Sequence, residues 1–365
     1  MDPTNPIQTP QLTLRERFFK SWFPPAAVVG GVVTLVAAAL RVRPEPKRQP
    51  TAPAAPAGGS AQSDLLQVQR PGAGPGMAVP LERQYALAAT IAGNALSAFR
   101  ESLLDVAVDG TDQVVALGDG HVRVFTAAGE PVRQWRAGDG AECLAVAPDR
   151  RVYVAGAGRV EIFETDGRGA GGFTFGDAAK PPSVSAIAVH GPDILVADAS
   201  ARIIRRFDAA GRQRNLIGDQ GKTKTFMLPN GRLDVNVDAA GVVRATDTGR
   251  HQVTAWTLDG APLGKFGKFG MQDPADFVGC CNPINVATTP DGKVVTSEKM
   301  VARVKVFEPV GRLLAVIGTE HFDPMCTQIH LAVDSEGRIL AADPVRRRIQ
   351  VFSPAAPGGA REVPS

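Results

Sequence analysis

One pattern of short strands recurs six times in this chain, and it constrains the fold more than any other feature. Each copy reads as an apolar strand, a turn with Asp or Gly, a second β-rich strand, a short polar loop and a third strand that ends in an aromatic residue. A further turn and a fourth strand ending in Gly follow. The third-strand aromatics are Phe125, Phe163, Phe207, Trp256, Phe307 and Phe352. Four-stranded repeats of this length predict the blades of a β-propeller.

The last copy lacks a fourth strand, and the missing strand is found at the other end of the repeats. The strand-ending glycines follow five of the six aromatics, at Gly138, Gly176, Gly218, Gly267 and Gly318. The segment Gln84–Gly93 has the form of a fourth strand and ends in Gly. An N-terminal strand that completes the last blade closes the ring and removes exposed sheet edges. An open stack would need polar caps, and none is visible. We therefore predict an all-β, six-bladed propeller over residues 84–354 and a disordered tail over 355–365.

The amino-acid sequence of the repeats resembles that of the NHL family. An acidic residue, a basic loop and an apolar–x–aromatic strand occur in three segments: Ile194–Gly211, Val242–Gly260 and the segment that begins at Ile339. The first two copies depart from the pattern through shortened loops, and Glu298 stands where the family has Asp. The resemblance implies a propeller that serves as an interaction platform.

The N-terminal part reads as an anchor and a tether. After a tail over residues 1–21, an uncharged apolar stretch over 22–40 is long enough to cross a bilayer as one helix. A cleaved signal peptide and a buried soluble helix are the alternatives. Residues 41–83 are rich in Pro, Ala and Gly, as in a semi-extended linker. We expect a single-pass cell-membrane protein whose propeller is extracytoplasmic (periplasmic).

Charge and cysteine content exclude two protein classes. The chain has 40 Lys and Arg against 37 Asp and Glu, a net charge of +3, without a basic stripe, so we expect no nucleic-acid partner. Four cysteines in 365 residues exclude a disulfide-dense secreted scaffold.

Three of the cysteines lie in long loops between successive blades. Cys281 and Cys326 occupy equivalent positions before neighbouring innermost strands, Cys280 is adjacent to Cys281, and His321 is near Cys326. These four residues could bind Zn²⁺ or an iron–sulfur cluster. A disulfide from Cys326 to Cys280 or Cys281, and free thiols packed at the channel rim, are the alternatives. Cys143 falls inside a strand and is predicted to be core.

An acidic residue follows the second strand in four of the copies. These residues, Asp198, Asp247, Glu298 and Asp343, could form a carboxylate ring for a cation. We favour a structural role, in which they bind main-chain N–H groups or pair with Arg202, Arg250 or Arg347.

Three functional hypotheses follow. The leading one is a membrane-tethered scaffold that binds a protein or an anionic ligand through the face bearing the interblade loops. Its binding residues are Lys268, Phe269, Glu298, Lys299, Arg250 and Arg347, with further basic charge from Lys222, Lys224 and Lys265. The second is a redox or metal accessory protein that uses Cys280, Cys281 and Cys326. The third is a metal-dependent enzyme like the lactonases and lyases of related folds, although no Glu, Asn and Asp set is evident at matched inner-strand positions and no catalytic residue is assigned.

Overall fold

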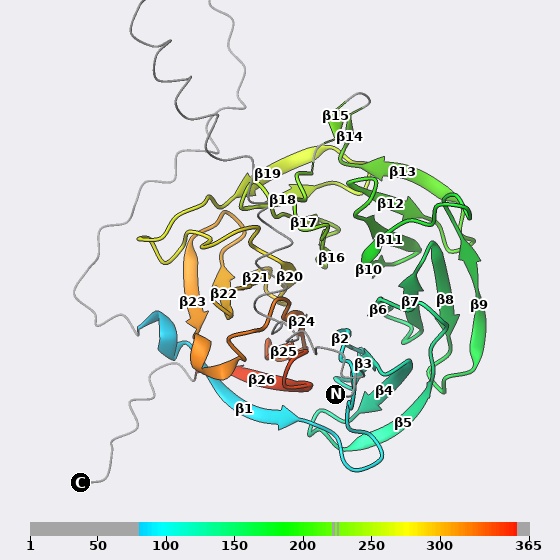
Figure 1. Ribbon diagram of the computed structural model, residues 1–365, viewed down its shortest axis with the longest axis horizontal. Coiled ribbons are helices and arrows are strands. Elements are labelled where there is room, and N and C mark those ends of the chain that lie inside the picture. Colours follow the sequence, from blue (N-terminus) through cyan, green and yellow to red (C-terminus); the bar gives the residue numbers. More distant parts are fainter. Residues whose placement is uncertain (1–79, 221–222, 225, 356–365) are drawn as a thin grey trace, which may run out of the picture. The chain divides into compact units, whose positions relative to one another are not determined.

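Six antiparallel sheets of four strands are arranged around a central axis (Figure 1). The computed structural model describes residues 80–220, 223–224 and 226–355. In five of the blades the strands follow the chain outward from the axis, so that the first strand lines the channel and the fourth lies at the rim. The predicted six-bladed propeller is confirmed.

The blades are built from short strands, most of them five or six residues long. Blade 1 contains β2 (Asp105–Val108), β3 (Val114–Gly118), β4 (His121–Phe125) and β5 (Pro131–Arg136). Blade 2 contains β6 (Cys143–Val146), β7 (Val152–Gly156), β8 (Arg159–Phe163) and β9 (Gly169–Thr174). Blade 3 contains β10 (Val184–His190), β11 (Asp193–Asp198), β12 (Ile203–Phe207) and β13 (Gln213–Ile217).

The second half of the ring repeats this plan. Blade 4 contains β16 (Val235–Val237), β17 (Val243–Asp247), β18 (Gln252–Trp256) and β19 (Pro262–Phe266). Blade 5 contains β20 (Asn285–Thr288), β21 (Val294–Glu298), β22 (Arg303–Phe307) and β23 (Leu313–Ile317). Two short strands, β14 (Asp219–Gln220) and β15 (Thr223–Lys224), pair in the loop before blade 4.

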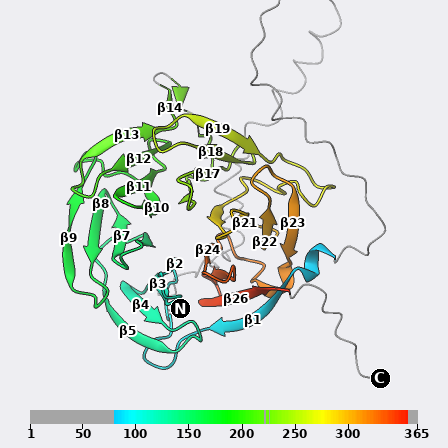
Figure 2. The same cartoon turned by 180° about the vertical axis from the view of Figure 1, so that it is seen from behind.

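Blade 6 joins the two ends of the propeller. It contains β24 (His330–Val333), β25 (Ile339–Asp343) and β26 (Arg348–Pro354), and its outermost strand is β1 (Tyr85–Ile91). The β1 strand pairs antiparallel with β26, from Tyr85 opposite Pro354 to Ile91 opposite Ile349 (Figure 2). The predicted closure by an N-terminal strand is therefore confirmed. Short 3₁₀ helices precede β1 (η1, Leu81–Arg83) and follow β23 (η2, Thr319–His321).

The hydrophobic core is divided into six clusters, one between each pair of neighbouring blades. Each predicted third-strand aromatic packs into the cluster that its blade shares with the preceding blade. Phe307 of blade 5, for example, packs with Val253 of blade 4, and Phe125 of blade 1 packs with Ile349 of blade 6. Because flat sheets bury both faces against their neighbours, the recurring aromatic fills the wedge between two blades.

Backbone conformation requires the glycine that follows the fourth strand in four of the six blades. Gly218 and Gly267 have φ values of 81° and 97°, a region that other residues rarely adopt. A Cβ atom at either position would also run into a buried ring, of Phe226 or Phe277 respectively. These glycines therefore turn the chain where it leaves one blade for the next.

The predicted anchor over 22–40 and the tail over 1–21 lie outside the described residues, as does most of the predicted linker over 41–83. In the part of the chain that the structure describes, no helix is long and apolar enough to cross a membrane. The predicted tail over 355–365 likewise falls outside, apart from Ala355.

Candidate functional site

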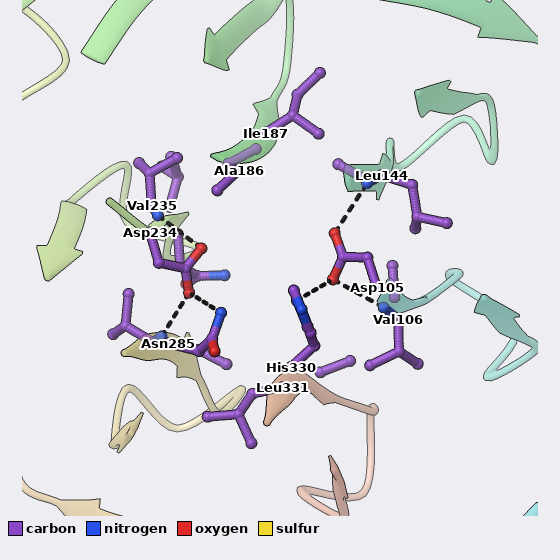
Figure 3. A pocket seen from close by; sticks show the side chains of 18 of the residues that line it. Asp105, Val106, Leu144, Ala186, Ile187, Asp234, Val235, Asn285, His330 and Leu331 are labelled. Carbon is purple, nitrogen blue, oxygen red and sulfur yellow. Dashed lines mark hydrogen bonds and ion pairs between the residues drawn. The ribbon is translucent and has the colours of Figure 1, made fainter. Parts of the chain in front are cut away.

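Polar residues surround the entrance to the central channel, where the innermost strands begin (Figure 3). Asp105, Asn285 and His330 are the first residues of β2, β20 and β24, and Asp234 directly precedes β16. They line a cavity of about 220 Å³ together with apolar side chains of all six innermost strands. This entrance lies at the same end of the propeller as the interblade loops, because those loops lead into the innermost strands.

Asp105 joins blade 1 to both of its neighbours. Its Oδ2 accepts a hydrogen bond of 2.9 Å from the main-chain N–H of Leu144 in blade 2. Its Oδ1 lies 3.2 Å from His330 Nδ1 of blade 6 and accepts a bond of 2.8 Å from the N–H of Val106. The carboxylate is thus shared among three blades (Figure 3).

Asp234 makes the corresponding connection between blades 4 and 5. Its Oδ2 accepts hydrogen bonds from the main-chain N–H of Val286, at 2.7 Å, and from Asn285 Nδ2, at 3.2 Å. Its Oδ1 accepts a bond of 2.9 Å from the N–H of Val235. Burial raises the pKa of Asp234 to about 7, and these hydrogen bonds only partly oppose the rise.

Two serines complete the inner hydrogen bonds between blades. Ser185 Oγ of blade 3 donates to the carbonyl of Leu233, before blade 4, at 2.6 Å. Ser297 Oγ of blade 5 donates to the carbonyl of Ile329, before blade 6, at 2.8 Å. Because the polar groups at the channel entrance are used in bonds between blades, their first role is to hold the ring together.

This inner set is not among the site residues predicted from the sequence. In blades 1, 4, 5 and 6 the polar residue stands four positions before the residue that begins the turn after the innermost strand, at Asp109, Asp238, Thr289 and Asp334. Aligning the blades on those turn residues therefore places Asp105, Asp234, Asn285 and His330 at the same position of each repeat, and this shared position is the sequence signal for the set.

The acidic residues after the second strands have the predicted structural role. Three of the four accept hydrogen bonds from the main chain of the interblade loop that leads into their own blade: Asp247 from the N–H of Met227, Glu298 from Val278 and Asp343 from Asp323, each at 2.8 to 2.9 Å. In blade 1, Asp119 accepts three such bonds, from Arg100, Glu101 and Ser102. These carboxylates fix the loops on the propeller face.

Their arginine partners differ in part from those predicted. Asp247 pairs with Arg250 at 2.6 Å, as predicted. Asp198 pairs with Arg205, at 2.8 Å, in place of Arg202. The main-chain N–H of Arg346, not a group of Arg347, binds Asp343, at 2.9 Å. Arg202 and Arg347 have positive φ values, 57° and 53°, and are themselves turn residues.

Glu298 cannot belong to a binding surface, because its side chain is fully buried. It pairs with Arg303 and with Lys305, whose Nζ is 3.0 Å away. Lys305 is also fully buried and donates to the carbonyl of Asp276 at 2.6 Å, and burial lowers its pKa to about 8. The predicted role of Glu298 as a binding residue is thus replaced by a structural one, anchoring the loop before blade 5.

The structure does not bring all four predicted metal ligands together, although Cys280 and Cys281 are in contact. Cys326 is buried among Phe322 and Ile329, its Sγ donates to the carbonyl of Gln328 at 3.0 Å, and burial raises its pKa to about 12. His321 packs edge-on against Phe352. In the described ranges, no group of three or more His, Cys, Asp or Glu side chains is placed to hold a metal ion.

All four cysteines are free, which matches the alternative of free thiols and not that of a disulfide from Cys326. Cys143 lies in the core, as predicted, and burial raises the pKa of its thiol. Cys280 is exposed, and its Sγ lies 2.9 Å from that of buried Cys281. Burial and this contact raise the pKa of Cys281 to about 11.

Exposed apolar side chains gather on the loops of blades 4, 5 and 6. Every methionine among the described residues is in these loops: Met227 is 44% exposed, Met271 77%, Met300 67% and Met325 76%. Phe269, at 57%, and Val345, at 42%, lie in the same set of loops. We call these six residues the methionine patch.

The blade 4 and blade 5 loops that carry part of the methionine patch contact each other. The ring of His251, in the blade 4 loop, lies 5.2 Å from that of Phe269, and its Nε2 is 2.9 Å from the carbonyl of Gly279. Met227 O accepts a hydrogen bond from the N–H of Gly249. The predicted basic residues Lys268, Arg250, Lys299 and Arg347 are in these loops as well, and all but half-buried Lys299 are exposed.

Comparison with known proteins supports the fold. No family model matches the chain. The protein brain tumor of Drosophila melanogaster is 27% identical over 143 residues, which are 39% of this chain and 13% of that protein. A catalytically inactive virginiamycin B lyase from Staphylococcus aureus, solved with quinupristin, has a TM-score of 0.50 at 10% identity. The aligned region covers 69% of this chain and 80% of the lyase chain.

A chain of the mitotic checkpoint complex has a TM-score of 0.53 at 11% identity, over 80% of this chain and 98% of its own. At these identities the solved structures show the propeller fold alone. The chain spans only a small part of the curated relative that it matches, and membership in the NHL family stays a proposal.

Proposed function

We propose that this protein is an NHL-like propeller that binds a protein partner through the methionine patch on its interblade-loop face. Six-bladed propellers are common protein-interaction scaffolds, and the observation that carries the proposal is the exposure of six apolar side chains on the loops of three neighbouring blades. Exposed apolar groups that gather in this way mark interaction sites. Methionine is flexible and polarisable and is frequent at surfaces that adapt to their partners.

The charge around the methionine patch favours an acidic partner segment with apolar side chains. Lys268 and Arg250 have side chains that are 72% and 39% exposed beside Phe269 and His251. Arg347 is exposed two residues from Val345. A ring of basic groups beside an apolar centre attracts acidic segments and orients them before the apolar contacts form.

The channel entrance contributes less to this proposal. Asp105 and Asp234 hold neighbouring blades through main-chain N–H groups, and removing them would disturb the ring. Substitutions of the methionines on the loop face should not disturb the ring, because these side chains make no bonds between blades. Binding loops on a rigid scaffold are the usual arrangement in such folds.

The test compares two triple variants in affinity capture from cells that express the protein. In the first, Met271, Met300 and Met325 are changed to Gln. In the control, Leu87, Leu263 and Val310, which are 44%, 55% and 75% exposed on other parts of the propeller, are changed to Gln. Proteins captured by the wild type and the control, and lost by the first variant, support the proposal. Equal capture by all three would refute the assignment of this face.

We further propose that residues 22–40 anchor the chain in the cell membrane and that the propeller is extracytoplasmic. The length and apolarity of that stretch support the anchor. The full chain should sediment with membranes and resist carbonate extraction, whereas a chain that begins at residue 80 should be released. After reduction, a membrane-impermeant maleimide should label exposed Cys280 while the inner membrane is intact. Recovery of the full chain in the soluble fraction would contradict the anchor, and labelling only after membrane lysis would contradict the location.

A further inference from the structure

Two adjacent thiols face each other at the end of the loop before blade 5. The Sγ atoms of Cys280 and Cys281 are 2.9 Å apart, and both thiols are free. Cys280 is exposed, whereas Cys281 is 3% exposed. Side chains of adjacent residues usually point apart in extended backbone. Here Cys281 has a φ of 64°, and the two thiols turn toward each other.

The surrounding chain holds this arrangement from both sides. On the N-terminal side, the carbonyl of Gly279 contacts His251 Nε2 at 2.9 Å. On the C-terminal side, Asn282 Nδ2 donates to the carbonyls of Val278, at 2.5 Å, and Lys299, at 3.1 Å. Asn282 Oδ1 accepts from the N–H of Lys299 at 2.9 Å. The dipeptide is thus fixed between loops of blades 4 and 5, and neither thiol must cross the loop to reach the other.

We propose that Cys280 and Cys281 are a redox-active dithiol that closes to a disulfide between adjacent residues by exchange with a low-molecular-weight disulfide such as glutathione disulfide. The other two cysteines take no part. Cys143 and Cys326 are buried in separate cores, and their Sγ atoms donate to main-chain carbonyls. This assignment is independent of the binding role of the methionine patch.

The exchange has two steps. The thiolate of exposed Cys280 attacks one sulfur of glutathione disulfide, the S–S bond of that disulfide breaks, and one glutathione leaves as a thiolate that takes up a proton. The thiolate of Cys281 then attacks the Cys280 sulfur of the mixed disulfide and releases the second glutathione. Two protein thiols are oxidised and one disulfide is reduced to two thiols, so atoms and electrons balance. Excess glutathione reverses both steps.

The test is mass spectrometry of the full chain, reduced and then exposed to glutathione disulfide. The wild type should lose about 2 Da, the mass of the two hydrogens removed. The loss should lie in the tryptic peptide Phe269–Lys293, which contains Cys280 and Cys281 and no other cysteine. The Cys281→Ser variant should stop at the mixed disulfide and retain one glutathione. The Cys280→Ser variant should react at least about tenfold more slowly, because Cys281 is buried.

Two further samples test whether the reaction is specific to Cys280 and Cys281 in the folded chain. The Cys326→Ser variant should form the same disulfide as the wild type. In denaturant, the equilibrium ratio of closed disulfide to mixed disulfide in that variant, measured at one fixed glutathione concentration, should fall by about tenfold or more, because the folded loop no longer holds the two thiols together. Accumulation of a stable mixed disulfide on the folded wild type would overturn the proposal. A disulfide that includes Cys326 or Cys143, or an unchanged ratio of closed to mixed disulfide in denaturant, would also overturn it.

Discussion

His330 Nδ1 lies 3.2 Å from Asp105 Oδ1, and this contact joins the last blade of the propeller to the first at the channel entrance. The same blades are joined at the other end of the innermost strands, where Ser335 donates through its N–H and its Oγ to Asp112, at 2.9 and 2.6 Å. Together with the pairing of β1 and β26, these bonds close the ring between residues that are far apart in sequence.

Loss of the Asp105 carboxylate should destabilise the propeller. In an Asp105→Ala variant the N–H of Leu144 loses its partner and His330 loses its contact with blade 1. We expect the free energy of unfolding to fall by about 1–3 kcal/mol, the usual cost of leaving a buried polar group unsatisfied. Denaturant unfolding measures the change. An Asp139→Ala control removes an exposed pair with Arg136 and should change stability by less than about 0.5 kcal/mol. Equal effects would show that Asp105 does not join the blades.

Asp234 should give the propeller a characteristic pH dependence. Burial raises its pKa from 3.8 to about 7. Between these values the folded protein keeps a proton that the unfolded chain releases. The stabilisation is therefore complete below about pH 4 and is lost as the pH rises through about 7. In an Asp234→Asn variant, the free energy of unfolding should fall less steeply over this range, by a few kcal/mol in total. Parallel pH profiles for the two proteins would contradict the raised pKa.

The architecture could be predicted from the sequence because each blade repeats the same local requirements. Aromatics such as Phe207 and Phe307 must fill a wedge between blades, and glycines such as Gly218 must adopt a positive φ after the fourth strand. The aromatic recurs in every blade and the positive-φ glycine in four of the six, so both are visible as a period. The missing fourth strand likewise indicated β1, because an unpaired edge at β26 would be unfavourable.

The functional residues were harder to predict because side-chain direction is set by packing between blades. Cys281 and Cys326 stand at equivalent positions, yet Cys326 faces a core cluster with Phe322, whereas Cys281 faces Cys280. The sequence position of Glu298 predicts a surface charge, but its carboxylate forms a buried ion pair with Lys305 on the neighbouring strand. The methionine patch has no period in the sequence, since its members come from loops of different lengths.

Lys305 should control the loop that carries Phe269, Met271 and the two adjacent cysteines. In a Lys305→Met variant, the carbonyl of Asp276 loses its donor and buried Glu298 keeps only Arg303 as a cation. We expect a loss of stability of about 3 kcal/mol, in the range for breaking a buried ion pair. Chymotryptic cleavage after Phe269 in the native state should accelerate. The control is Lys293→Met, which removes an exposed pair with Asp291. Unchanged cleavage in the Lys305 variant would mean that other contacts hold the loop.

The closing strand should be required for a soluble propeller. A chain that begins at residue 80 keeps β1, and we expect it to remain monomeric with cooperative unfolding. A chain that begins at residue 93 leaves the main-chain groups of β26 unpaired along Ile349–Pro354 and removes Ile91 from the core between blades 6 and 1. Exposed strand edges promote association, and the loss of buried apolar groups lowers stability. Size-exclusion chromatography and thermal unfolding of the two chains test this expectation. A monomeric shorter chain with the same melting temperature would show that the ring closes without β1.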